Sequence, residues 1–278
     1  MTRVLITGAN GFVGHQIIRS LDVKDIDLIP IVREGKENTV SNFKNVKKII
    51  TSKDLFAEDE SWWEEQCKDV DIIIHAAWYV ETGKYQDSSK NIDCLIGSLK
   101  LAKGAAKAGV SRFLGLGTCA EYDQSQGVLT IDTHLKPLTT YAAAKASLFT
   151  TLSQWFPRES VSFAWIRLFY LYGEGEDQKR LVPYVRSQIL QGDLVELTSG
   201  KQVRDFMNVA EVGKKIAEIS LTNQIGPINL CSGIPITVRQ FVEKIADEYG
   251  RKDLLRFGVR EDNLFDPPSV VGVSNVQQ

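Results

Sequence analysis

A short apolar segment followed at once by three regularly spaced glycines is the feature that most constrains how this chain can fold. Residues 3–7 (RVLIT) have the character of a buried strand, residues 8–14 read GANGFVG, and a helical pattern then runs to about Leu21. Glycines at this place let the backbone turn tightly and approach a pyrophosphate, whose charge then lies at the N-terminus of the helix. A plain tight turn is the alternative, but the position between a first strand and a first helix favours a dinucleotide-binding loop.

Four further apolar segments continue the alternation of strand and helix. They cover residues 28–32, 46–50, 71–75 and 113–116, and the second of them is the weakest. Because helical patterns separate several of these segments, they predict a parallel, doubly wound sheet in an α/β fold. Nearly unbroken apolar runs are typical of strands that helices cover on both faces.

Beyond Pro157 this alternation loosens, and glycine and charge cluster in residues 173–177. We expect residues 1–172, with a returning segment at about 205–232, to form the cofactor-binding domain. Residues 173–204 and 233–278 would form a smaller C-terminal lobe that binds the substrate.

Charge and cysteine usage exclude several classes of function. A formal net charge of −2 offers no electrostatic attraction to nucleic acid or to an anionic membrane. The cysteines are widely spaced and form no C-x-x-C pair, so we expect neither a metal site nor a redox dithiol. No apolar run reaches membrane-spanning length, and the first strand leaves no room for a signal peptide, so we expect a cytoplasmic protein. The four cysteines are Cys67, Cys94, Cys119 and Cys231.

Tyr141 and Lys145 are four residues apart in a predicted helix, so they share one of its faces. A lysine charge beside the phenol would lower the pKa of Tyr141 from its ordinary value of about 10 toward a range useful for proton transfer. Such spacing also arises by chance, so this interpretation depends on the motifs around it.

Together with the glycine loop, this pair resembles the extended branch of the short-chain dehydrogenase/reductases, the NAD-dependent epimerase/dehydratase family that acts on nucleotide sugars. The glycine spacing is G-x-x-G-x-x-G, and several further segments match the family in order along nearly the whole chain. They are residues 71–77 (DIIIHAA), Asn91 at a helix start, residues 117–122 (GTCAEY), residues 204–209 (RDFMNV) and residues 229–233 (NLCSG). The resemblance implies a Rossmann-like fold.

The resemblance also implies a catalytic set and a cofactor site. Tyr141 would exchange a proton with the reacting oxygen, Thr118 would hydrogen-bond that oxygen, and Lys145 would hold the pKa of Tyr141 down and bind the nicotinamide ribose. When Thr118 is taken alone, the other interpretation is a structural one, in which a hydroxyl at the end of a strand hydrogen-bonds to the backbone. The residues expected to bind the cofactor are Gly8, Asn10, Gly11, Phe12, Val13, Gly14, Arg33, Asp54, Leu55, Ala76, Ala77, Asn91, Tyr141 and Lys145.

Cofactor choice depends on the end of the second strand. Arg33 follows Gly14 by 19 residues and would suit the 2′-phosphate of NADP, whereas the neighbouring Glu34 could bind the ribose of NAD. We therefore expect NADP(H) to be favoured over NAD(H).

Arginines are the candidates for binding the diphosphate of a nucleotide sugar, because the guanidinium fork matches phosphate oxygens. In the family, arginines near Arg204 and Arg260 commonly do this, although Arg260 could equally form a surface salt bridge. The full set expected to bind the substrate is Thr118, Cys119, Tyr170, Arg180, Arg204 and Arg260.

Two departures from the family pattern narrow the reaction. The 4,6-dehydratases of the family carry Asp-Glu directly after the Ser/Thr, whereas Cys119 and Ala120 stand here, so we expect no dehydratase. Tyr170 replaces a frequent asparagine, which puts one phosphate or sugar contact in question. Residues 78–80 and 117–122 resemble the 4-ketoreductases of nucleotide-linked 6-deoxyhexoses, such as CDP-paratose synthase.

Three functions follow from these residues. The first is NAD(P)H-dependent reduction of the 4-keto group of a nucleotide-linked 6-deoxyhexose. The second is nucleotide-sugar 4-epimerisation with tightly bound NAD, and the third is a non-catalytic dinucleotide sensor on the same fold. Tyr141, Lys145 and Thr118 argue against the sensor, which requires none of them.

Two further expectations concern assembly and the chain end. The helix at residues 91–108 has two apolar stripes, so it is buried either between the sheet and a neighbouring helix or in a subunit interface. We expect a homodimer through the helices of residues 91–108 and 141–154. Family relatives usually continue with a short helix past this C-terminus, which implies a truncated chain or a missing tail.

Overall fold

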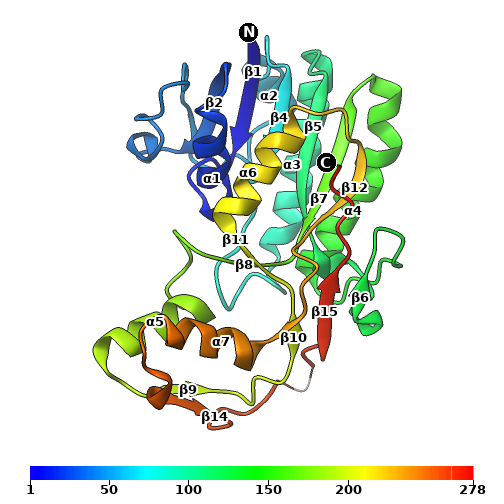
Figure 1. The fold of residues 1–278 in the computed structure, drawn as a ribbon. Helices are drawn as coiled ribbons and strands as arrows, with labels where there is room; N and C mark the ends of the chain where they lie inside the picture. The colour runs from blue at the N-terminus through cyan, green and yellow to red at the C-terminus, as the bar shows by residue number, and fades with distance from the viewer. Residues whose placement is uncertain (264, 278) are drawn as a thin grey trace.

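The computed structural model, which describes residues 1–263 and 265–277, has a seven-stranded sheet at its centre (Figure 1). The strand order is β12-β7-β5-β4-β1-β2-β3, and every neighbouring pair is parallel. The predicted parallel, doubly wound α/β fold is therefore confirmed. The strands are β1 (Thr2–Thr7), β2 (Ile26–Arg33), β3 (Ile50–Ser52), β4 (Ile72–His75), β5 (Arg112–Thr118), β7 (Ser162–Leu168) and β12 (Gly226–Leu230).

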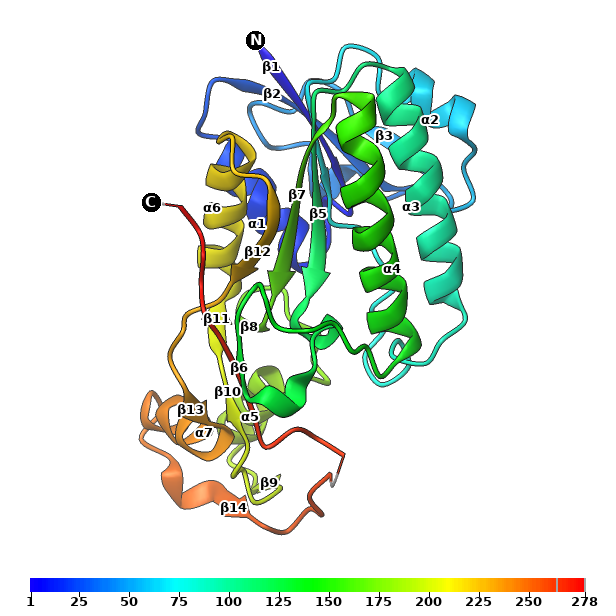
Figure 2. The same cartoon turned by 90° about the vertical axis from the view of Figure 1, so that its right-hand side faces the viewer.

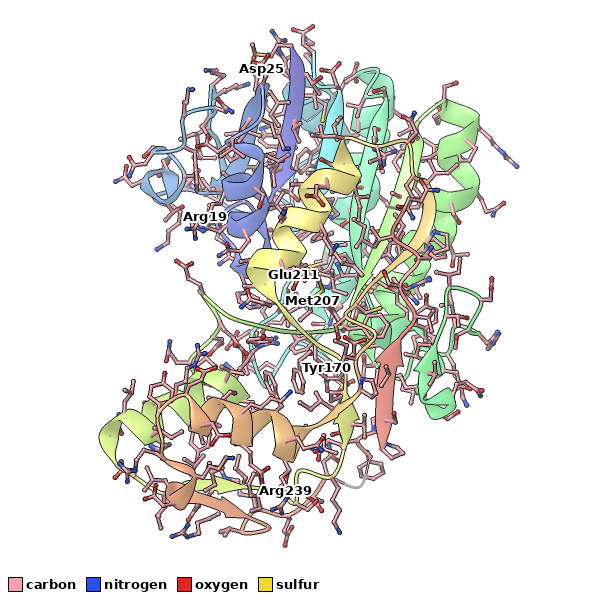
Figure 3. The ribbon with its side chains drawn as sticks, in the orientation of Figure 1. Arg19, Asp25, Tyr170, Met207, Glu211 and Arg239 are labelled. Atoms are coloured by element: carbon pink, nitrogen blue, oxygen red, sulfur yellow. The ribbon has the colours of Figure 1, made fainter. Side chains whose placement is uncertain are left out.

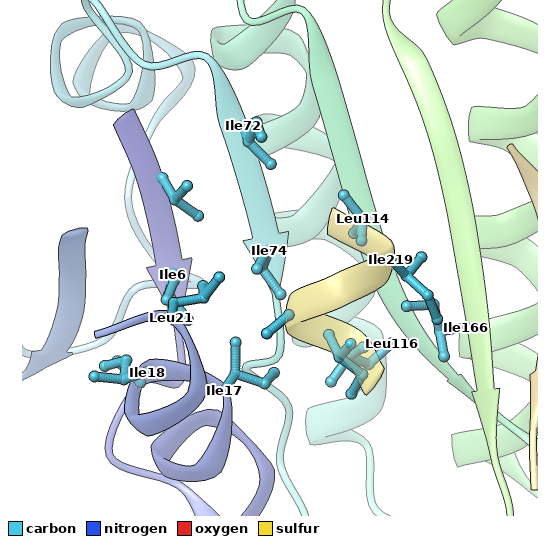
Figure 4. Packing of buried hydrophobic residues seen from close by; sticks show 14 of the residues in the cluster. Ile6, Ile17, Ile18, Leu21, Ile72, Ile74, Leu114, Leu116, Ile166 and Ile219 are labelled. Carbon is cyan, nitrogen blue, oxygen red and sulfur yellow. The ribbon is translucent and has the colours of Figure 1, made fainter. Parts of the chain in front are cut away.

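Successive strand residues point to opposite faces of the sheet, and both faces are covered by helices. Val4 and Ile6 of β1 pack in one apolar cluster with α1 and α6, whereas Leu5 packs in the other with α2, α3 and α4. Figure 4 shows the first cluster, in which Ile17 of α1 and Ile74 of β4 lie together. The helices are α1 (Phe12–Leu21), α2 (Glu60–Gln66), α3 (Lys90–Lys107), α4 (Thr140–Trp155) and α6 (Val209–Ser220).

The third strand lies later in the chain than the sequence predicts. Val46 forms only an isolated bridge to Leu28, and the paired strand begins at Ile50. Lys47 and Lys48 are exposed and interrupt the run, whereas Ile50 and Ser52 turn into the structure. The prediction of a strand over residues 46–50 is therefore wrong for all but its last residue.

A smaller group of elements lies beyond the carboxyl ends of the sheet strands (Figures 1 and 2). Helices α5 (Leu181–Gln191) and α7 (Val238–Asp247) share an apolar cluster with the parallel pair β9 (Val195–Leu197) and β14 (Leu255–Phe257). The remaining strands are β6 (Val128–Leu129), β8 (Tyr170–Tyr172), β10 (Val203–Arg204), β11 (Phe206–Asn208), β13 (Ile236–Thr237) and β15 (Ser269–Gly272). The short 3₁₀ helices are η1 (Glu37–Thr39), η2 (Cys119–Glu121), η3 (Gln124–Gln126), η4 (Phe156–Glu159) and η5 (Lys252–Leu254).

The two apolar stripes of α3 have different surroundings. Cys94, Leu101 and Ala105 are buried against the rest of the chain, whereas Ile92 and Ile96 are 52% and 50% exposed. Packing within one chain therefore covers one stripe and leaves part of the other in solvent.

Among the described residues, no helix combines the length and the apolarity that crossing a bilayer requires.

Helices α1 and α6 approach so closely that Gly213 has no room for a side chain. A Cβ built there would lie 2.5 Å from Cβ of Gln16 and 2.7 Å from its carbonyl carbon. The glycine therefore sets the distance between these helices.

We expect Gly213→Ala to lower the free energy of unfolding by about 1–3 kcal/mol, because the added methyl must push backbone apart. Urea unfolding followed by circular dichroism measures this. Lys214→Ala, at the neighbouring exposed position, is the control and should change stability by less than about 0.5 kcal/mol. Equal stability of Gly213→Ala and the unmodified chain would contradict the expectation.

Candidate active site

The glycine loop forms a cradle between β1, α1 and the segment after β4. Gly8 has φ +65°, and a Cβ there would lie 2.8 Å from backbone atoms of Ala77. A Cβ at Gly14 would lie 2.1 Å from the carbonyl oxygen of Gly8. Gly11 caps α1 without a side-chain hydrogen bond, and the first turn of that helix has no acidic residue. Free N–H groups and the absence of Cβ atoms fit the pyrophosphate of a dinucleotide.

Further residues that the sequence predicts to bind the cofactor lie around this cradle. Asn10, Phe12 and Val13 lie within the turn and the first turn of α1, and Ala76 directly follows β4. A dinucleotide bound there would supply a nicotinamide ring for hydride transfer.

A buried histidine fixes the segment after β4, against which the glycine loop packs. His75 lies 2.8 Å from Thr7 Oγ1 through Nδ1 and 2.8 Å from Ser98 Oγ through Nε2. Ser98 Oγ donates to the Cys94 carbonyl and therefore accepts from Nε2, which leaves Nδ1 to accept from Thr7. Thr7 Oγ1 in turn accepts the backbone N–H of Ala77. This chain of hydrogen bonds requires a neutral imidazole. Burial lowers the pKa of His75 to about 3, and the charge of Lys145 contributes to the same shift.

The predicted contacts for the adenosine half lie at the ends of β2 and β3. Arg33 is the last residue of β2 with an exposed side chain, and Glu34 beside it donates its backbone N–H to the Ser52 carbonyl. Asp54 is also exposed and accepts the backbone N–H of Phe56, while Leu55 is partly buried. Both an arginine and a carboxylate are therefore available at this edge.

Thr118, Tyr141 and Lys145 come together where β5 ends against the first turns of α4. Lys145 is buried, and its Nζ donates to the Leu116 carbonyl of β5 at 2.6 Å. The same ammonium lies 3.8 Å from the centre of the Trp78 ring, and the Tyr141 ring meets Trp78 edge-on. Trp78 thus contacts both members of the pair.

The electrostatics of this pair differ from the sequence prediction. Burial raises the pKa of Tyr141 above its ordinary value, Tyr85 and Glu121 raise it further, and a hydrogen bond from the Thr118 hydroxyl opposes them. Burial also lowers the pKa of Lys145 to about 7. The expected depression of the Tyr141 pKa by Lys145 is therefore wrong, because loss of hydration, reinforced by Tyr85 and Glu121, outweighs the effects that favour the phenolate.

Asn91 lies in the wall of the site. Its Oδ1 accepts from Trp78 Nε1 at 2.9 Å, and its Nδ2 donates to the carbonyls of Tyr85 and Ser88. Because it is fully buried and its polar atoms are engaged, Asn91 orients the loop of residues 78–88 rather than presenting a free amide to a cofactor.

A second group of predicted residues lines the side toward the smaller lobe. Tyr170 of β8 lies at the level where the sheet meets that lobe (Figure 3). The Arg204 guanidinium is buried and stacks 5.1 Å from the Tyr170 ring, and its Nη2 lies 2.6 Å from an Asp266 carboxylate oxygen. Burial raises the pKa of Tyr170, and the Tyr170 side chain packs against the apolar cluster that contains Cys119. Burial raises the pKa of the Cys119 thiol to about 12.

Arg180 and Arg260 lie apart from Arg204. Arg180 caps the N-terminus of α5, where its partly buried side chain is near Asp177. Arg260 is exposed and donates to the Tyr184 hydroxyl at 2.8 Å while stacking on that ring. The structure therefore brings one predicted arginine to Tyr170, and it holds Arg260 against α5.

Sequence reasoning missed Glu121, Trp78 and Arg167 as parts of this site. Glu121 and Arg167 form a buried ion pair at 2.8 Å beneath Thr118. The signal that could have found Arg167 is a charged residue inside the apolar run of residues 161–168, and GTCAEY contains Glu121 itself.

Comparisons with known proteins place the chain among enzymes of one family. A model of the NAD dependent epimerase/dehydratase family matches residues 4–227. The chain is 21% identical over 271 residues to dTDP-6-deoxy-L-talose 4-dehydrogenase (NAD(+)) of Aggregatibacter actinomycetemcomitans, covering 97% of this chain and 98% of that protein. It is 27% identical over 219 residues to CDP-abequose synthase of Salmonella typhimurium, covering 75% and 67%.

Among solved structures, a dTDP-glucose 4,6-dehydratase from Streptomyces venezuelae with NAD and TYD bound superimposes with a TM-score of 0.83. It is 21% identical, and the match covers 98% of this chain and 88% of that one. Likeness at this identity shows the shared fold.

The neutral state of His75 predicts a specific pH dependence of stability. An unfolded histidine gains a proton near pH 6.5, whereas folded His75 does so only near pH 3. As pH falls through this window, the unfolded chain binds the extra proton, and the free energy of unfolding drops by up to about 1.4 kcal/mol per pH unit from this group.

His75→Gln keeps a donor and an acceptor but cannot be protonated, so its stability should fall less steeply between pH 6.5 and 4. Urea unfolding of both proteins across this range measures the difference. Parallel curves for the two proteins would contradict a neutral, buried His75.

Proposed function

Because this chain belongs to the NAD dependent epimerase/dehydratase family, we propose that it reduces the 4-keto group of a nucleotide-linked 6-deoxyhexose. The observation that carries the proposal is the grouping of Tyr141, Thr118 and Lys145 at a cradle suited to a dinucleotide. The C4 carbon of the sugar would gain a hydride from the reduced nicotinamide, and the carbonyl oxygen would gain a proton from the protein.

Tyr141 is protonated at neutral pH, as a proton donor must be, although burial makes its phenol a weaker acid than it would be in water. Thr118 Oγ1 accepts the backbone N–H of Ala120, and its own O–H, which is directed toward Tyr141, would donate to a sugar oxygen that lies between the two side chains. Lys145 would provide positive charge near the ribose and the phenol. These are the roles that the sequence predicts for Tyr141, Thr118 and Lys145.

The surroundings of Thr118 argue against dehydration. Removing the C5 proton needs a base, and burial keeps the Cys119 thiol protonated, with a pKa of about 12, while Ala120 has no functional group. Glu121 is the nearest carboxylate in sequence, but it accepts from Thr118, Trp165 and Arg167 and is fully buried. A hydride reaction without elimination is therefore favoured.

The names of two relatives support chemistry at position 4. One is a 4-dehydrogenase of a dTDP-linked 6-deoxy sugar, and the other is CDP-abequose synthase. For the diphosphate of this chain's substrate we propose Arg204, which lies beside Tyr170 and would exchange Asp266 for phosphate oxygens. Arg260 would join it only by leaving Tyr184.

We further propose that a second copy of the chain covers α3 and α4. The exposed Ile92 and Ile96 lie on α3, which packs beside α4. Apolar side chains at this spacing suit helix packing between two subunits.

The reaction is tested by incubating the purified chain with NADPH or NADH and a panel of nucleotide-linked 4-keto-6-deoxyhexoses. We expect Tyr141→Phe to lower kcat by about 10²–10⁴-fold, because it removes the proton donor and leaves the ring in place. Loss of reduced-nicotinamide absorbance measures the rate. Tyr249→Phe, which alters an exposed phenol on the smaller lobe, is the control.

Stoichiometric consumption of the reduced cofactor would support reduction. Tightly retained NAD with interconversion of sugars and no net oxidation would overturn it in favour of 4-epimerisation. Unchanged turnover in Tyr141→Phe would remove the phenol from the chemistry altogether.

We propose NADP(H) as the preferred cofactor because Arg33 is exposed at the end of β2, although one relative is named for NAD(+). Arg33→Gln should lower kcat/KM for NADPH about ten- to hundredfold, as expected for lost charge-assisted hydrogen bonds, and leave the value for NADH nearly unchanged. Arg158→Gln, at an exposed arginine on η4, serves as the control. An equal loss with both cofactors, or a preference of the unmodified chain for NADH, would contradict this assignment.

A further inference from the structure

A buried ion pair lies directly beneath the proposed catalytic threonine. Glu121 and Arg167 are 0% and 1% exposed, and Arg167 Nε donates to Glu121 Oε2 at 2.8 Å. Burying two charges costs more free energy than the pair regains unless further hydrogen bonds complete it. Such a pair is weak evidence for a role in stability, so its position suggests another role.

Glu121 holds Thr118 through reciprocal capping of η2. Its Oε1 accepts the backbone N–H of Thr118 at 2.8 Å, and the Thr118 hydroxyl accepts the backbone N–H of Ala120 at 3.2 Å. Together these bonds fix the backbone of Thr118 and one lone pair of its hydroxyl. The hydroxyl proton is left to point toward Tyr141, whose pKa it lowers.

The end of β5 leaves room for the Glu121 carboxylate, because Gly117 has no side chain. A Cβ at Gly117 would lie 2.5 Å from Glu121 Oε1 and 2.2 Å from Trp165 Nε1. Trp165 Nε1 uses that space to donate to both oxygens of Glu121, at 3.1 and 3.0 Å. The carboxylate is thus clamped by donors from its own strand end and from β7.

Arg167 connects the clamp to the helix that carries the other catalytic residues. Its guanidinium carbon lies 4.6 Å from the centre of the Phe149 ring on α4 and 4.5 Å from that of Tyr122. Its Nη1 donates to the Tyr122 hydroxyl, which donates to Asn229. The end of β5 and α4 therefore share one rigid support.

We propose that Glu121 is a positioning residue for hydride transfer, whose buried carboxylate aims the Thr118 hydroxyl at the reacting oxygen and supplies negative charge beside Lys145. This inference rests on the proposed function and extends it to a group that touches neither substrate nor cofactor.

Packing around Lys145 supports the effect of the Glu121 charge on it, because Lys145 Nζ lies 5.8 Å from the centre of the Trp165 ring, whose Nε1 donates to both oxygens of Glu121. Glu121 raises the pKa of Lys145 against the larger effect of burial, with Cys94 of α3 as a weaker contributor. His75 of β4 faces the same ammonium and is neutral. Tyr141 is faced by Tyr85, Glu121 and Cys119. Glu121 is therefore the carboxylate that acts on both catalytic side chains.

The test compares Glu121→Gln, which removes the charge, with Glu121→Asp, which keeps the charge but shortens the reach to Thr118. Each should lower kcat by about 10²-fold, because a misdirected hydroxyl no longer meets the transition state. In a Thr118→Val background Glu121→Asp, which keeps the charge, should have no further effect on kcat, since coupled residues are not additive. Glu121→Gln should keep only the part of its loss that arises from the charge beside Lys145.

A titration without substrate separates this inference from the proposed function. In protein with ¹³C-labelled lysine side chains, assigned with Lys145→Met, the Lys145 signal should titrate near pH 7 and at lower pH in Glu121→Gln. Glu121→Asp should leave that midpoint nearly unchanged. An unmodified chain that is inactive on every 4-keto sugar but shows these shifts would overturn the proposed function and support the role of Glu121.

Tyr122→Phe is the matched control, because it removes hydrogen bonds at the far end of the same network. It should lower stability and leave kcat unchanged. The inference is overturned if Tyr122→Phe reproduces the loss of kcat, if the losses from Glu121→Asp and Thr118→Val add, or if folded Glu121 variants keep full activity. Failure of both Glu121 variants to fold would likewise assign the residue to folding alone and overturn it.

Discussion

Parallel pairing of all seven sheet strands is the constraint on which the rest of the structure depends. It brings the carboxyl ends of β1, β4, β5 and β7 to one edge, so segments far apart in the sequence supply neighbouring parts of one site. The glycine cradle follows β1, its floor at Ala77 follows β4, and Thr118 ends β5. Because helices cover both faces of the sheet, these strand ends are held rigidly, and the smaller lobe can only lie across them.

Loss of hydration is the common cause behind the chemistry of this edge. It raises the pKa of Tyr141, lowers that of Lys145 to about 7 and keeps His75 neutral. These shifts would work against a charged active site without compensation. Glu121 offsets the effect of burial at Lys145, whose pKa it raises, whereas at Tyr141 it adds to the rise that burial causes. The site therefore behaves as one electrostatic unit in which a change at one group is felt at the others.

The fold and the main site segments were accessible from sequence because their signals are local. Apolar runs mark the strands, three glycines mark the cradle, and the spacing of Tyr141 and Lys145 marks a shared helix face. The weak third segment was misplaced because two lysines obscure where pairing resumes. The direction of the Tyr141 shift was wrong because spacing reveals a neighbouring charge but not the extent of burial. The roles assigned to individual site residues remain predictions.

By itself, the sequence determined the α/β fold with its parallel sheet, the glycine turn and the family to which the chain belongs. These properties depend on residues within a few positions of one another. Tertiary structure alone decided that Glu121 pairs with Arg167, 46 residues away, and that His75 links Thr7 to Ser98 across 68 and 23 residues. Which buried charges face each other, and how far water is excluded from them, depends on how the strands and helices pack. That packing converts a tyrosine and a lysine at helical spacing into a site whose protonation states are set by their surroundings.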